Sequence, residues 1–459
     1  MSNVVPGKAT TDSSSYSWPQ CAANWKAARA GEPTRWSAEY PIHTDSWTTG
    51  GIDGGLGPYQ YINALAIREK HESHLYPAVI LRVDWHLPED ALKPNLARSE
   101  FDRYHAGYVE DEMAALLGLQ LGIRARAGAT SRQFDPEGDP KGRPSAGHFK
   151  RIPPIPYPRL GRRILPWASR DHYLNAAVNP TFERLHTLQY EDAAAIVKAA
   201  RLHQEALWIA ESAPEMAWLL LVTAVETAAS HWRRASVSPI DWLSDRKPRL
   251  RALFKGEGRD DLFQAVADEL ANLVGATAQF RGFLQSFCPP PPSERPQECY
   301  QHAWDRESLR KTFNVIYKRR SDFVHSGIPF PAMMCMQPWP DEKNRKLYAE
   351  KPLGKAMATQ GASWKQADAP MQLHIFEYIV RGALLEWWKW CLPGTPYLNA
   401  AARAELEQIP GIGPKQAERI ASHRILHGEF ESFDDLLTVA GIGQKTVDAI
   451  QACTTLAKK

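Results

Sequence analysis

The chain has 459 residues, enough for two to four domains, and 44% hydrophobic and 23% charged residues, as is typical of a folded protein. Its 55 Lys and Arg against 52 Asp and Glu give a net charge of +3, which excludes a chain that binds nucleic acid through its overall charge. Six cysteines without a CxxC pair argue against a zinc site and a disulfide framework, so we expect no metal, no other cofactor and a reducing cytoplasm.

No membrane association is expected. The first 20 residues lack the basic and apolar regions of a secretory signal. The longest apolar run, 216–225, is well below the roughly 20 residues that span a bilayer.

The patterns predict a multidomain, mainly α fold that begins with a mixed α/β domain over residues 1–140. The first 50 residues are rich in Ser, Thr, Pro and Trp without helical periodicity, which predicts an irregular lead-in. Tyr76–Trp85 reads as a strand, and Val109–Gly128 as a helix that starts with acidic residues and ends at glycine.

Residues 141–189 are predicted to be a basic, proline-rich connector. From 141 to 170 there are eight Lys and Arg, no acid and six prolines, which excludes a regular helix. Two interpretations stay open: an extended strap that contacts nucleic-acid phosphates, and a solvated interdomain connector.

Residues 190–392 have helical periodicity and predict a bundle. Pro-rich breaks such as Cys288–Pro296 separate its segments. Five segments have helix length: 191–212, 214–232, 260–275, 308–327 and 371–390.

Residues 397–459 contain a repeat with a spacing of 30 residues, in which IPGIGPK (409–415) matches VAGIGQK (439–445). Each copy reads as helix, Gly-Ile-Gly hairpin, second helix. The glycines permit tight turns, and the hairpin presents backbone N–H groups at a helix N-terminus, where a phosphate is favoured. Lys415 and Lys445 add a charge in the first turn of each second helix.

This region resembles the tandem helix-hairpin-helix domain of competence protein ComEA and its relatives, with Asn399 as an expected helix cap and Phe430 opening the second unit. The resemblance implies sequence-independent binding of DNA through backbone phosphates. Seven positions match the family's binding positions: Gly411, Gly413, Lys415, Gly441, Gly443, Lys445 and Thr446. From Leu398 to Lys459, however, seven Lys and Arg face eight Asp and Glu, a net charge of −1, so a protein-binding version of the domain stays open.

A second motif, YKRRSDFVHSG (317–327), has an Arg-x4-His spacing between Arg320 and His325. This motif resembles the signature of HEPN domains. The order also resembles the family's arrangement, in which an earlier buried helix carries one glutamate, here Glu226. The resemblance departs at Ser326, because the family usually has glycine directly after the histidine.

The HEPN resemblance implies metal-independent RNA cleavage by a homodimer in which two such motifs share a cleft. His325 is the expected acid/base and Arg320 the expected phosphate clamp, since histidine titrates near neutral pH and arginine stays charged. Five residues along a helix place the two about 140° apart around the axis, so one chain alone is not expected to complete the site. Possible auxiliary residues are Glu226, Lys318, Arg319 and Ser321.

The sequence thus predicts an RNA-cleaving bundle coupled to a DNA-binding module, with prokaryotic antiviral defence suggested by analogy. Two alternatives remain. In one, Arg320 and His325 only stabilise the bundle, and the protein is a non-enzymatic DNA-binding adaptor with an inert HEPN-like dimerisation domain. In the other, the C-terminal repeat binds protein.

Overall fold

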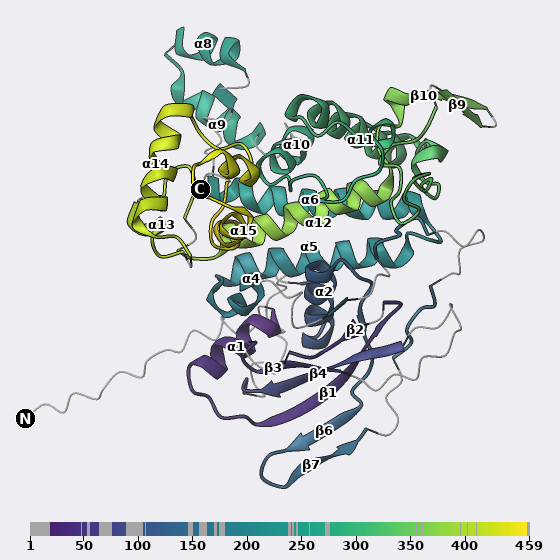
Figure 1. The fold of residues 1–459 in the computed structure, drawn as a ribbon, viewed down its shortest axis with the longest axis vertical. Coiled ribbons are helices and arrows are strands. Elements are labelled where there is room, and N and C mark those ends of the chain that lie inside the picture. Colours follow the sequence, from purple (N-terminus) through teal and green to yellow (C-terminus); the bar gives the residue numbers. More distant parts are fainter. Residues whose placement is uncertain are drawn as a thin grey trace, which may run out of the picture.

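The computed structural model is mainly α-helical, with a small antiparallel sheet in its N-terminal part, as the sequence predicts. Figure 1 shows the sheet below, the long helices above it and the C-terminal helices beside one end of the long helices. Among the described helices, none is long and apolar enough to cross a membrane. The structure describes residues 19–456 except 47, 53–55, 64–75, 89–103, 106, 146–149, 156–162, 169–171, 174–179, 237–239, 241–242, 245–246, 257, 271–275, 355, 360, 395, 402 and 410.

The N-terminal sheet has the strand order β3-β4-β1-β6-β7, with β5 paired to one end of β1. Strand β4 has the predicted bounds, and its alternate residues Val79, Leu81 and Val83 are buried, as expected for a strand with one face in the core. The strands are Trp36–Thr44 (β1), Tyr59–Asn63 (β3), Tyr76–Trp85 (β4), Arg126–Ala127 (β5), Arg132–Asp135 (β6) and Asp139–Pro144 (β7), with a separate parallel pair of Thr48–Thr49 (β2) and His172–Tyr173 (β8).

The predicted irregular lead-in is wrong for residues 20–44; residues 1–18 lie outside the described part. Gln20–Arg29 form helix α1, and β1 is the central strand of the sheet. The helix escaped prediction because its buried residues are small or polar around Trp25, rather than large aliphatic residues at helical spacing. The buried carboxylate of Glu112 accepts the N–H groups of Gln20 (3.0 Å) and Cys21 (2.7 Å) at the start of α1.

The predicted helix 109–128 ends early. Helix α2 spans Val109–Leu121, because Gly122 takes a left-handed conformation (φ 68°) and donates its N–H to the carbonyl of Gly118. The chain beyond it returns to the sheet as β5.

The predicted boundary after residue 140 is also wrong, because it falls inside β7, which forms a hairpin with β6. Parts of the expected connector then pack on the N-terminal fold: Lys150 pairs with Asp111 (2.5 Å) and Arg163 with Asp45 (2.7 Å). These two cations are therefore held by carboxylates rather than left for a phosphate.

All five predicted helices of the bundle region form: Tyr190–Ile209 (α5), Pro214–Ser236 (α6), Asp260–Leu270 (α9), Arg306–Ser326 (α11) and Leu373–Cys391 (α12). One of them, α9, packs instead with Pro248–Gly256 (α8) around Phe263, apart from the main core. Ala276–Ser286 (α10), which the periodicity did not single out, supplies Phe280 and Phe283 to the main core in its place.

The shorter elements connect these helices. They are Pro180–Glu183 (α4), the hairpin of Ala356–Thr359 (β9) and Ala362–Lys365 (β10), and the 3-10 turns Leu185–Thr187 (η3), Glu298–Tyr300 (η4), Ala332–Met334 (η5) and Gln366–Asp368 (η6).

One hydrophobic core joins the sheet region to the bundle, although the sequence predicts separate domains there. Helix α2 packs against α5, and buried Arg124 joins them by donating to the carbonyl of Leu207 (2.7 Å) and pairing with Glu211 (3.0 Å). Trp387 and Trp388 of α12 are buried in this core.

The C-terminal module, residues 397–456, has its own core. It consists of Arg403–Leu406 (α13), Pro414–His427 (α14), the 3-10 helix Phe433–Thr438 (η7) and Gln444–Cys453 (α15). Buried Lys389 of α12 joins it to the bundle by donating to the carbonyl of Gln451 in α15, beside the ring of Phe433. Because carbonyls at a helix C-terminus attract cations, this contact stabilises the position of α15.

Candidate nucleic-acid interface

The two hairpins of the C-terminal module have the same backbone geometry. Gly411 and Gly441 are in the left-handed region, with φ of 86° and 81°, so these two positions require glycine for the turn. Gly413 and Gly443 are extended, with φ of −92° and −111°, and act as N-caps of α14 and α15.

The second glycine of each hairpin has a different role from the one predicted. A Cβ atom on Gly413 or Gly443 would meet no described atom within 4 Å, so the fold itself does not exclude a side chain there. The space outside these positions is open to solvent. A ligand can therefore approach the backbone closely at both helix N-termini.

The predicted cations flank these openings. Lys415 and Lys445 are exposed in the first turns of α14 and α15, as the repeat predicts. Thr446 lies one position further, and its N–H donates to the carbonyl of Gly443 (2.8 Å). The structure thus brings together Gly443, Lys445 and Thr446 at one helix start, and Gly413 with Lys415 at the other.

Asn399 is the expected helix cap; residue 402, just before α13, lies outside the described part, so this role stays a prediction. In the described structure, Asn399 bonds to the second unit. Its side-chain amide donates to the carbonyl of Phe430 (3.0 Å), and its side-chain oxygen accepts the Phe430 N–H (2.9 Å). This pair of bonds joins the start of the first unit to the start of the second, so Asn399 stabilises the arrangement of the repeat.

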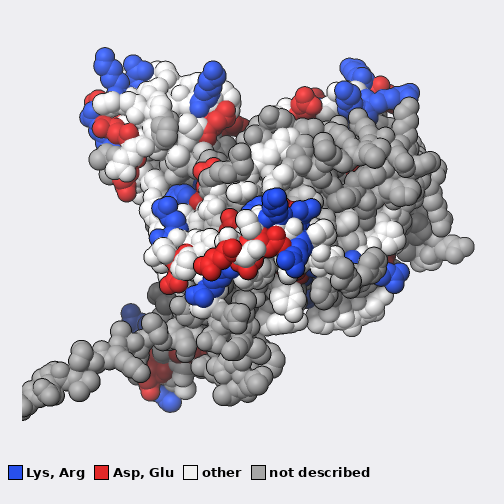
Figure 2. Space-filling model, turned by 90° about the horizontal axis from the view of Figure 1, so that it is seen from below, with Lys and Arg blue, Asp and Glu red and all other residues white. Residues whose placement is uncertain are grey.

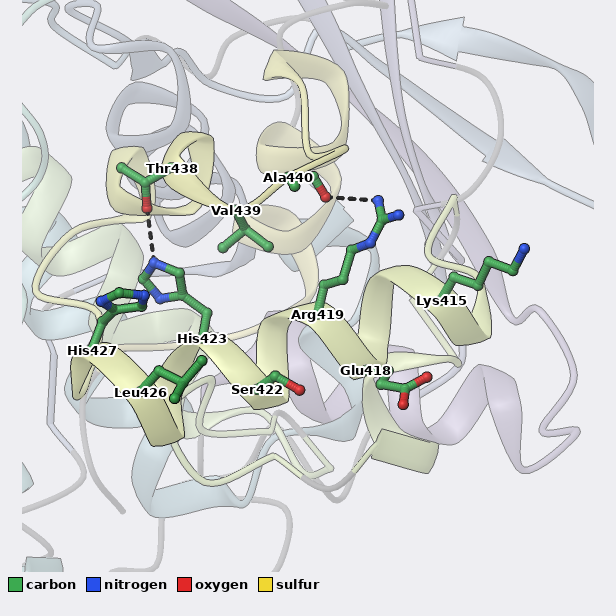
Figure 3. A pocket seen from close by; sticks show the side chains of 10 residues that line it. All are labelled: Lys415, Glu418, Arg419, Ser422, His423, Leu426, His427, Thr438, Val439 and Ala440. Atoms are coloured by element: carbon green, nitrogen blue, oxygen red, sulfur yellow. Dashed lines mark hydrogen bonds between the residues drawn. The ribbon is translucent and has the colours of Figure 1, made fainter.

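A shallow groove of about 450 Å³ runs along α14 and the segment that enters the second hairpin. In Figure 3 the Arg419 guanidinium points across this groove to Ala440, and its Nη1 donates to the Ala440 carbonyl (2.9 Å). The lining residues are Lys415, Glu418, Arg419, Ser422, His423, Leu426, His427, Thr438, Val439 and Ala440. Arg419 was not predicted as a site residue, although its spacing of four from Lys415 places both on one face of α14.

The predicted bundle site is organised around Glu226 of α6. Its carboxylate accepts the Tyr317 hydroxyl (2.9 Å) and pairs with Arg320 (3.0 Å), both from α11. Burial, together with the nearby Glu226 charge, raises the pKa of Tyr317 to about 12. Glu226, an auxiliary candidate from the sequence, therefore contacts Arg320, and the sequence did not predict this contact.

The remaining cations near this site are also paired. Lys318 bonds to Asp322 (2.6 Å), and Arg319 bonds to Asp368 (3.2 Å). Ser321, the other auxiliary candidate, is half-buried on the same helix. The charges of Lys318 and Arg319 are therefore balanced by carboxylates within the chain.

His325 is exposed in the last turn of α11, which ends at Ser326 with Gly327 in the left-handed region (φ 64°), as predicted. Arg320 is held against α6 instead of meeting His325. Within this chain, the structure thus assembles Glu226, Tyr317 and Arg320 and leaves the histidine facing solvent.

The described surface does not carry one continuous basic face on the side drawn in Figure 2, where blue Lys and Arg alternate with red Asp and Glu. Local donors at the hairpins, rather than net charge, are thus the feature that favours an anion. Among the described residues, no group of three or more His, Cys, Asp or Glu side chains has the arrangement of a metal site.

Comparison with known proteins supports the C-terminal assignment. Residues 397–454 match the family described as the helix-hairpin-helix motif. This helix-hairpin-helix match covers the module and not the bundle. The HEPN resemblance of residues 190–392 stays a prediction.

Two relatives show similarity over short stretches. The chain is 37% identical over 59 residues to ComE operon protein 1 of Bacillus subtilis (strain 168), which is 13% of this chain and 29% of that protein. It is 40% identical over 52 residues to an uncharacterized protein of Haemophilus influenzae, 11% of this chain and 46% of that protein. The chain therefore spans less than half of either relative. No solved structure matches it.

Proposed function

We propose that the C-terminal module binds DNA through backbone phosphates, without sequence preference. The observation that carries this proposal is the open space at Gly413 and Gly443, each at the N-terminus of a helix with a lysine in its first turn. Helix N-termini favour anions, and close backbone approach needs no side chain in the way. The helix-hairpin-helix match and the similarity to ComE operon protein 1 support it.

The charge of the module predicts how this binding behaves. A net charge of −1 for residues 398–459 means that long-range attraction to DNA is weak, so contacts at the hairpins dominate. Phosphate contacts release counterions, and we expect affinity to fall as salt rises. Because phosphates carry no base identity, duplexes of unrelated sequence should bind alike.

The test is fluorescence anisotropy of the full chain with two labelled duplexes of equal length and unrelated sequence. Replacing both Gly413 and Gly443 with Glu places carboxylates where phosphates would lie, and we expect a loss of affinity of more than about 100-fold, since two phosphate contacts are removed. Both positions have extended backbone and free space, so the fold should tolerate the change. Circular dichroism and thermal unfolding check that the double variant keeps its fold.

The same double variant can also contradict DNA binding by the hairpins. If the double variant binds both duplexes as well as the wild type, the hairpins do not contact DNA. Capture of a partner protein that is lost in the same variant would then favour the protein-binding version of the module.

We further propose, as a second function, that a dimer of the bundle cleaves RNA without metal, with Arg320 as phosphate clamp and His325 as acid/base, in a cytoplasmic defence role. The exposed His325 at the end of α11 favours it, whereas the Glu226 carboxylate that already accepts from Arg320 favours the inert bundle. In a cleft shared by two copies, His325 of one copy would lie near a phosphate held by Arg320 of the other copy. The competing function is a DNA-binding adaptor with an inert bundle.

Incubation of the full chain with total tRNA in EDTA separates these two functions. RNA cleavage that disappears in His325→Ala, with unfolding temperature unchanged because the side chain is exposed, supports the ribonuclease. Products ending in 2′,3′-cyclic phosphate identify attack by the neighbouring 2′-hydroxyl. If the RNA stays intact both with and without duplex DNA, the result favours the DNA-binding adaptor with an inert bundle.

A further inference from the structure

The two hairpins differ in the number of backbone donors that they offer. In the first hairpin, the Gly413 N–H donates to the side-chain oxygen of Gln416 (3.0 Å), and the next residue is Pro414, which has no N–H. Lys415 is then the first residue after Gly413 whose N–H is not bonded to any part of the chain that the structure describes.

The second hairpin has no such losses. Residue 446, the counterpart of Gln416, is a threonine whose side chain does not bond to Gly443 in the described structure. Gln444 stands where the first unit has Pro414. Gly443, Gln444 and Lys445 therefore present three successive N–H groups with no acceptor among the described residues.

A cation from the first unit also serves the second hairpin. Arg419 extends from α14, and its Nη1 lies at the carbonyl of Ala440, directly before Gly441. A Cβ on Gly441 would lie 2.4 Å from that nitrogen, so the guanidinium rests on the glycine of the turn. Figure 3 shows the Arg419 side chain reaching across the groove to Ala440, while Lys415 does not extend toward Ala440.

The second unit has no arginine at the equivalent position. The position 30 residues after Arg419 is Ala449, which cannot place a charge on the first hairpin. Arg419 is exposed, and the guanidinium has five N–H donors, of which one is bonded to Ala440. Its remaining donors are available beside the hairpin with the most open amides.

We infer that the second hairpin is the main phosphate site of the module and that Arg419 contacts the same DNA backbone as Lys445. The inference rests on the proposed DNA binding and makes the two units unequal: the first mainly supplies a cation to the second. The ligand is the phosphodiester backbone of duplex DNA, because a guanidinium beside three amides matches the oxygens of a phosphate.

Paired substitutions in the full chain test this inequality. We expect Arg419→Gln and Lys445→Gln each to weaken binding to duplex DNA by about tenfold and to lower the salt dependence by about one phosphate contact. Lys415→Gln should weaken it by less than about threefold, because its hairpin offers fewer donors. Arg419→Lys keeps the positive charge, so its DNA binding should have most of the salt dependence of the wild type. If the role of Arg419 were purely structural, the salt dependence would not follow the charge at this position.

A backbone substitution gives an independent measurement. Gln444→Pro makes the second hairpin resemble the first, and proline fits this position since Gly443 is extended and the residue is the first of α15. Gln444→Ala loses the same side chain and keeps the N–H. We expect the proline variant to bind about threefold to tenfold more weakly than the alanine variant, as for loss of one charge-assisted bond.

The outcomes separate this inference from the proposed function. Equal effects of Lys415→Gln and Lys445→Gln, or unchanged affinity and salt dependence in Arg419→Gln, overturn the inequality while DNA binding stands. Absence of DNA binding in the wild type overturns the proposed function itself. Circular dichroism identifies any variant that has unfolded. If a charge variant unfolds, the DNA affinities of Gln444→Pro and Gln444→Ala test the inference, and equal affinities overturn it.

Discussion

The C-terminal hairpins and the end of α11 both carry conspicuous cations, but the fold treats these cations in opposite ways. Lys415 and Lys445 are exposed beside backbone N–H groups at helix starts. Arg319 and Arg320, in contrast, are bonded to Asp368 and Glu226. The comparison teaches that a basic motif favours an anionic ligand where the chain leaves its donors available, and favours stability where a carboxylate already accepts them.

The largest effect is expected for Glu226→Ala. It removes the acceptor of both Arg320 and the Tyr317 hydroxyl. We expect the free energy of unfolding to fall by about 2 kcal/mol, since buried Tyr317 and half-buried Arg320 lose their partner. Chemical denaturation measures it. Glu226→Gln keeps an acceptor and should lose less. Full stability in Glu226→Ala would mean that Arg320 is free for a substrate, which would break the comparison.

Lys389→Met tests the contact that joins the two regions. It removes a buried charge that bonds to Glu386 and to the carbonyl of Gln451, and we expect a loss of about 1–2 kcal/mol at this contact. Hydrogen exchange should rise in the last turn of α15 and leave α5 and α6 protected. Unchanged exchange in α15 would show that the module is held by other contacts.

Gly441→Ala and Gly443→Ala sharpen the difference between the two glycines of a hairpin. Gly441 has φ of 81° and lies against Arg419, so alanine there should destabilise the module by about 1 kcal/mol or more. Gly443 has φ of −111° and open space, so alanine there should keep stability and weaken DNA binding. Hydrogen exchange and anisotropy on both variants separate the effects, and equal destabilisation would contradict this division.

The smallest effect is expected for Lys318→Ala. Its bond to Asp322 is at the surface, with 68% of the Lys318 side chain exposed, and such pairs contribute about 0.5 kcal/mol or less. Thermal unfolding should therefore be nearly unchanged. A large loss of RNA cleavage in this stable variant would show that Lys318 contacts substrate, in favour of the ribonuclease.

Local patterns predicted the elements whose signal lies within a short stretch. The strand Tyr76–Trp85 and the five bundle-region helices formed, because alternation and helical periodicity are read from neighbouring residues. Helix α1 and the early end of α2 were missed, since α1 buries small side chains and Gly122 had no more local signal as a stop than Gly128.

The sequence by itself determined the repeat of the C-terminal module and the places of its glycines and lysines, because a 30-residue repeat with glycine in each turn is a local property. Only the tertiary structure decided which donors are available. The side-chain oxygen of Gln416 accepts the Gly413 N–H, and Arg419 donates to the Ala440 carbonyl of the other unit. Glu226 accepts from Arg320 on a distant helix. These pairings depend on which side chains the packed helices bring within bonding distance, and sequence spacing does not contain that information.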